Sequence, residues 1–199
     1  MDNQLKKQNS LFIFLGTLIL ASLACTVSVG GPDYSDRPTI PVSNDMAESL
    51  KDEVKRAFEA GAQTGEVTIQ ITEPQITSLL ALRFQADQNL QQNSEPLITD
   101  PQVYLRDGQM QIFGQTHQGM FTANIGIIVT VGVDENGGPK IELTSADFGP
   151  FPAPDGLKDA IATMIQEAYT GSVGPVATGL RIQTITIADG IMTITGRIK

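Results

Sequence analysis

The chain has 199 residues and a formal net charge of −9, from 13 Lys and Arg against 22 Asp and Glu. This length suits one domain plus an appendage, and the acidic balance argues against nucleic acid, whose phosphates need compensating cations. A single cysteine excludes an internal disulfide and a multi-cysteine metal site, and a single histidine excludes a multi-histidine centre. We therefore expect no metal and no cofactor.

Residues 1–24 have the organisation of a signal peptide. Lys6 and Lys7 precede an apolar run of 14 residues that extends from Leu11 to Ala24. A helix that spans a membrane needs about 20 apolar residues, so this run is too short to span one and fits the core of a secretion signal.

The only cysteine of the chain, Cys25, comes directly after this run. The arrangement resembles a bacterial lipoprotein signal, which implies that the thiol of Cys25 carries a diacylglycerol and anchors the protein at the extracytoplasmic face of the cell membrane. Two acyl chains anchor firmly where one is marginal. The usual leucine three residues before the cysteine is replaced by Ser22. An ordinary secreted protein cleaved at the same bond and an uncleaved anchor stay open as alternatives.

Residues 25–44 are predicted to form the lipidated cysteine and a flexible tether. The stretch 26–44 is rich in Gly, Pro, Ser and Asp and has no apolar period. A single domain is expected to follow over residues 45–199.

The first elements of this domain are predicted to be a helix, a strand and a second helix. A long N-terminal helix is expected over residues 45–62, capped by Ser43 or Asn44. Alternating apolar residues predict a half-buried strand over residues 66–71, and a capping-box pattern at Thr72–Gln75 then starts a second helix. The residues that this second helix turns inward are expected to be Ile76, Leu79, Leu80 and Phe84.

Two hairpins and one long strand dominate the rest of the domain. Asp-Gly pairs are strong two-residue turn signals, and they predict hairpins over residues 103–113 and 182–195. Residues 119–133 alternate between apolar and polar side chains and predict an unusually long strand, with a turn at 134–138 leading to its partner strand. A third helix is expected from about residue 155 to 169. The two hairpins are similar in sequence, through either an internal repeat or convergence on the same turn rules.

Together these elements predict an α+β fold, in which a curved, mostly antiparallel sheet packs against the long N-terminal helix and two shorter helices. The order of elements resembles small bacterial envelope proteins of the YpmS-like and LmeA-like kind, which are similar to the tubular lipid-binding superfamily. The resemblance covers about residues 46–198. It implies an apolar groove between sheet and helix that binds a phospholipid or another acyl ligand.

The groove is expected to be lined by the apolar side of the long strand and by inward helix residues. The candidate lining residues are Leu79, Leu80, Ile125, Ile127, Val129 and Ile161. No arrangement of residues points to catalysis, since His117 lies alone in a polar turn and residues 134–138 lack the spacing of a calcium loop. The sequence thus predicts a non-enzymatic lipoprotein that binds lipid or, alternatively, docks another envelope protein. It does not predict the oligomeric state.

Overall fold

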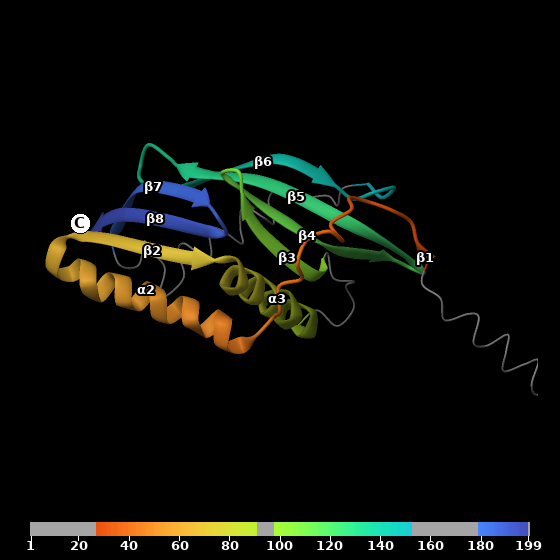
Figure 1. The fold of residues 1–199 in the computed structure, drawn as a ribbon, viewed down its shortest axis with the longest axis horizontal. Helices are drawn as coiled ribbons and strands as arrows, with labels where there is room; N and C mark the ends of the chain where they lie inside the picture. Colours follow the sequence, from red (N-terminus) through yellow and green to blue (C-terminus); the bar gives the residue numbers. More distant parts are fainter. Residues whose placement is uncertain (1–26, 91–97, 153–178, 199) are drawn as a thin grey trace, which may run out of the picture.

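The computed structural model describes residues 27–90, 98–152 and 179–198. Within these ranges the protein is α+β and contains two helices and two sheets of mostly antiparallel strands (Figure 1). The fold class predicted from the sequence is confirmed, but the strands form two sheets and not one. The predicted signal peptide and the helix expected at 155–169 lie outside the described residues.

The larger sheet has five strands in the order β1-β5-β4-β3, with β6 also paired to β5. Only the short β1–β5 pairing is parallel. The strands of this sheet are β1 (Val27–Ser28), β3 (Thr99–Arg106), β4 (Gln109–Gln118), β5 (Phe121–Val133) and β6 (Pro139–Asp147). The smaller sheet has the order β2-β8-β7, and its strands are β2 (Glu66–Thr72), β7 (Leu180–Ala188) and β8 (Ile191–Ile198).

Both predicted Asp-Gly hairpins form, with the register of a two-residue turn. In the first, Leu105 lies opposite Met110, and in the second, Ile187 lies opposite Met192. The two residues of each turn have positive φ angles, 54° and 74° at Asp107-Gly108 and 51° and 80° at Asp189-Gly190. Positive φ at both central residues is the signature of a type I′ turn, which matches the twist of the strands that it joins.

The long strand is also observed. β5 has 13 residues, and its odd-numbered side chains from Ala123 to Val129 are buried. Its predicted partner returns as β6, in which Leu143 lies opposite Val129 and Ile141 lies opposite Val131. The β5–β6 connection closes as a turn because Asp134 Oδ1 accepts hydrogen bonds from the backbone amides of Asn136 and Gly138. This carboxylate is therefore part of a turn, as predicted.

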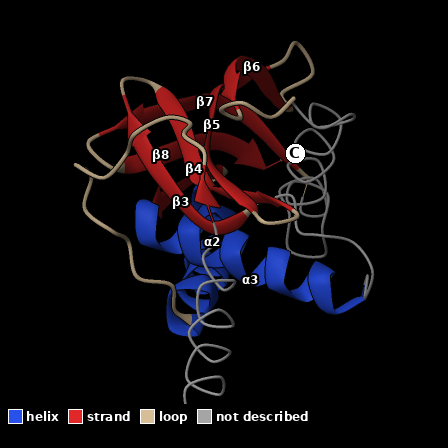
Figure 2. Ribbon diagram, turned by 90° about the vertical axis from the view of Figure 1, so that its right-hand side faces the viewer, coloured by secondary structure: helices blue, strands red, loops and turns tan. Residues whose placement is uncertain are grey.

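The two helices lie on the same side of the sheets (Figure 2). Helix α2 (Asn44–Thr64) runs along β2, and α3 (Glu73–Leu90) packs against β3. Ser43 caps α2 by accepting a hydrogen bond from the Met46 amide, and Gly65 ends it in the left-handed conformation. At the start of α3, Gln75 Oε1 accepts the Thr72 amide at 2.9 Å, which is the reciprocal half of the predicted capping box.

Helix α2 approaches β2 closely at Gly61. A Cβ atom at this position would lie 2.5 Å from Val67 Cγ2 and 2.8 Å from the Glu66 carbonyl oxygen. Because one of these atoms belongs to the backbone, the contact cannot be relieved by a side-chain rotation alone. The absence of a side chain at Gly61 therefore sets the distance between helix and strand.

We expect Gly61→Ala to lower the free energy of unfolding by about 1–3 kcal/mol, because overpacking at this contact outweighs the gain of about 1 kcal/mol in helix propensity. Urea unfolding followed by circular dichroism measures the change. Gly132→Ala is the matched control, since a Cβ there meets nothing within 4 Å. Equal stability of the Gly61→Ala and parent proteins would show that the helix shifts freely on β2.

The segment predicted to be a tether contacts the domain over its described part. Residues 27–43, which we call the strap, lie along the larger sheet. β1 pairs with β5, and backbone hydrogen bonds continue from Val29 to Thr122 and from Asn124 to Gly30, each 2.9 Å long. Gly and Pro correctly predicted the lack of regular structure between Val29 and Ser43, and part of this irregular backbone finds hydrogen-bond partners on β5.

Side chains of the strap also cover the outer face of this sheet. Ile40 is buried with Tyr104 and Phe113, and Tyr34 packs against them. The Arg37 guanidinium carbon lies 4.7 Å from the centre of the Phe113 ring. Burial raises the pKa of Tyr104, whose neutral hydroxyl donates to the Pro38 carbonyl at 3.1 Å. The larger sheet is thus covered on both faces, by the strap on one and by the main core on the other.

Candidate functional site

The candidate groove residues of β5 lie in the main core. Ile125, Ile127 and Val129 have exposed fractions of 0%, 1% and 0%. They form one apolar cluster with residues of both sheets, which joins the two hairpins into a continuous layer. The other buried members are Ile98, Val103, Leu105, Met110, Ile112, Phe148, Ile187 and Met192.

Helix α3 contributes the opposite side of this layer. Leu80 packs against the cluster but is only half-buried, as are Ile76 and Phe84 on the same helix. Leu79 is half-buried as well. The structure therefore places Leu80 together with the three predicted β5 residues. The β5 side chains of this layer, which we call its floor, are buried, and the α3 side chains, which we call its rim, are partly exposed. Ile161 and Cys25 lie outside the described residues.

Sequence reasoning missed a polar junction where the two hairpins meet. Glu73, the first residue of α3, accepts a hydrogen bond from the Leu105 amide at 2.7 Å and forms an ion pair with Arg106. The amide of Gly190, in the turn of the second hairpin, donates to the Leu105 carbonyl at 3.1 Å. Gly190 in turn accepts the Glu73 amide at 3.2 Å. One carboxylate and one glycine thus hold both sheets and α3 together.

The same helix covers the edge of the larger sheet. β3 is an edge strand, and its outward backbone groups would otherwise be open to pairing with another chain. Thr77 Oγ1 accepts the Val103 amide at 3.0 Å, and Gln102 bonds both backbone groups of Ile40 in the strap. This edge is therefore already occupied by side chains and by the strap, so a partner strand cannot add along it.

Neither a metal site nor a membrane-spanning helix is found in the described part of the chain. Within residues 27–90, 98–152 and 179–198, no group of His, Cys, Asp and Glu side chains is arranged to hold a metal ion. His117 lies near the end of β4, opposite Thr122 of β5. None of the helices in these ranges is long and apolar enough to cross a membrane.

Comparison with known proteins adds no assignment, since no family model, curated protein or solved structure matches the chain. The similarity to YpmS-like and LmeA-like proteins and to the tubular lipid-binding superfamily stays a prediction.

Proposed function

We propose that the protein is an extracytoplasmic lipoprotein, anchored in the cell membrane through a diacylglycerol on Cys25, whose domain binds a lipid or another apolar ligand. The anchor is supported by the position of the only cysteine, directly after a signal-like run. The described fold then begins at Val27, two residues later. In this proposal the two sheets and α2 together correspond to the curved sheet and long helix of the tubular lipid-binding superfamily.

Lipid binding is supported mainly by the difference in exposure between the two sides of the apolar layer. The β5 floor at Ile127 is closed, whereas Leu80 and Phe84 on α3 are partly exposed. Ligand pockets are clefts lined mainly by apolar side chains, and in this proposal an acyl chain enters between α3 and β5. An acyl chain with about ten buried methylenes gains roughly 8 kcal/mol before the costs of association, so micromolar affinity needs no charged clamp.

Native mass spectrometry tests this binding. A chain that starts at Val27 keeps the strap and every described element, and it is purified from bacterial cells without detergent. We expect a population whose mass exceeds that of the polypeptide by one phospholipid or fatty acid. A single species at the polypeptide mass, unchanged after incubation with phospholipid vesicles, would contradict lipid binding.

The anchor is tested by Cys25→Ser in the full chain. The serine hydroxyl cannot receive the diacylglycerol by thioether formation, so we expect the variant to leave the membrane fraction or to stay unprocessed. Membrane fractionation and electrophoretic mobility measure this outcome. Ser28→Ala, close to the cleavage region but without a thiol, should fractionate as the parent does. Retention of the Cys25→Ser protein in membranes with unchanged mobility would contradict lipidation.

Docking of another envelope protein is the second candidate, and it is favoured by the full burial of Ile125, Ile127 and Val129. A closed core leaves no room for an acyl chain. A partner would then use the other surfaces, such as β6, which is paired only with β5 in the described sheet. A lipid-free mass spectrum together with a stable complex captured through β6 would favour this function over lipid binding.

A further inference from the structure

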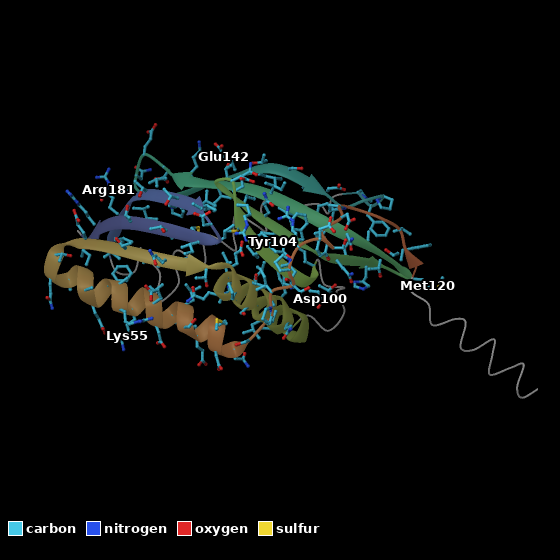
Figure 3. All side chains as sticks on the ribbon, in the orientation of Figure 1. Lys55, Asp100, Tyr104, Met120, Glu142 and Arg181 are labelled. Atoms are coloured by element: carbon cyan, nitrogen blue, oxygen red, sulfur yellow. The ribbon has the colours of Figure 1, made fainter. Side chains whose placement is uncertain are left out.

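Two large apolar side chains are exposed next to each other at one end of the molecule. Met120 is 68% exposed in the turn between β4 and β5, and Phe121, the first residue of β5, is 45% exposed. Gly119 opens this turn with a φ of 60°, and Gln118 pairs with Phe121 across it. Figure 3 shows Met120 at the tip, far along the longest axis from Lys55 and Arg181. We call residues 118–122 the β4–β5 tip.

The strands that form the tip carry no formal charge. Residues 108–133 contain no Asp, Glu, Lys or Arg, although these four make up 18% of the chain. Residues 25–32, which include the strand paired with the tip, contain none either. In a protein with a net charge of −9, these two segments therefore contribute none of the acidic groups that anionic headgroups would repel. Exposed apolar side chains that lie together mark interaction surfaces.

The tip also lies close to the proposed anchor. Val27 is the backbone partner of Phe121 in the parallel β1–β5 ladder. Paired strands lie about 4.8 Å apart. Two residues of chain reach at most about 7 Å, so Cys25 cannot be far from Val27. Because the strap is fixed to the sheet, a lipid on Cys25 must enter the membrane beside Phe121 and not at the end of a long spacer.

From this placement we infer that the β4–β5 tip inserts Met120 and Phe121 into the interface of the bilayer that holds the lipid on Cys25. The partner is the lipid surface itself, and the inference rests on the proposed lipidation. Apolar side chains at such a contact reach about 5–10 Å into the boundary between headgroups and acyl chains. In this orientation the β4–β5 tip faces the membrane, and the smaller sheet and α2 lie toward the opposite end of the molecule (Figure 1).

The chain contains no tryptophan, which permits a sharp test. Phe121→Trp places a single fluorophore at the tip, and Lys55→Trp places one on the exposed side of α2 as the matched control. Both full-length, lipidated proteins are reconstituted in vesicles of phosphatidylethanolamine and phosphatidylglycerol, with or without lipids brominated near the upper end of the acyl chain. Met120→Trp is a second tip probe, since a residue as exposed as Met120 tolerates replacement without loss of folding.

We expect the Phe121→Trp and Met120→Trp proteins to emit at shorter wavelength and to lose fluorescence with brominated lipid, whereas the Lys55→Trp protein stays unquenched. Mass spectrometry of the N-terminal peptide reports separately whether Cys25 carries lipid. If Cys25 carries lipid but the tip tryptophans are not quenched, the inferred tip contact is wrong and the proposed anchor still holds. A blue shift without quenching would place the tip against another protein and overturn the contact as well. Absence of lipid on Cys25 would overturn both the proposed anchor and this inference.

Discussion

Glu73→Ala is expected to lower the free energy of unfolding by about 2–3 kcal/mol. The carboxylate is only 13% exposed, and its removal leaves the amide of the fully buried Leu105 without the partner that it has at 2.7 Å. An unsatisfied buried donor costs about 1–3 kcal/mol, and the lost pairing with Arg106 adds a smaller amount because Arg106 is 43% exposed. Urea unfolding followed by circular dichroism measures the change.

Two control variants separate the hydrogen bond from the charge. Glu73→Gln keeps an oxygen that accepts from the Leu105 amide, so we expect it to recover more than half of the loss. Glu59→Ala removes a carboxylate that is 65% exposed and should change stability by less than about 0.5 kcal/mol. If Glu73→Gln were as destabilising as Glu73→Ala, the ion pair with Arg106 and not the amide would hold the junction.

Elements that depend on neighbours in the sequence could be predicted well. Both Asp-Gly hairpins, with their registers, follow from the turn type and from alternation on each side of it. The helix expected over 45–62 is observed as α2, with Ser43 as its N-cap. In each case the residues that determine the element lie within a few positions of one another, so one sequence contains the whole signal.

Structure that depends on distant partners could not be predicted. The strap looks like a spacer because its partners, such as Thr122 and Phe113, lie far away along the chain. The junction between the two sheets is equally invisible in the sequence, because there Gly190 bonds Leu105, which lies far away along the chain. Ile40 and Tyr34 gave no clear signal, because single apolar residues in a polar stretch are also common on protein surfaces.

The candidate groove shows the same limit. Alternation along β5 identified the side that carries Ile125, Ile127 and Val129, and the structure places all three in one cluster with Leu80. Alternation alone does not distinguish a groove from a core, because both need the same apolar side chains. The difference is in what lies opposite, and a pair of substitutions at one of these positions separates the two cases.

Ile127 is the position at which a groove and a closed core give opposite results. Ile127→Ala removes side-chain atoms from a site that is 1% exposed, and we expect a loss of about 2–5 kcal/mol. Ile127→Trp adds volume and costs about 1–3 kcal/mol. If an acyl chain lies over Ile127, the alanine variant keeps or enlarges the space for it and still binds a fluorescent fatty acid, whereas the tryptophan variant fills this space and loses binding.

The measurement combines probe displacement with thermal unfolding in the presence and absence of phospholipid. A ligand that binds only the folded state raises the midpoint, so the parent and Ile127→Ala proteins should gain stability with lipid and Ile127→Trp should gain none. Val42→Trp, at a position that is 42% exposed, controls for the added ring itself. A folded Ile127→Trp protein that binds the probe as well as the parent would remove this part of β5 from the ligand site. A parent protein that neither binds the probe nor gains stability with lipid would favour docking of an envelope partner, because the apolar layer would then serve only as the core that joins the two sheets.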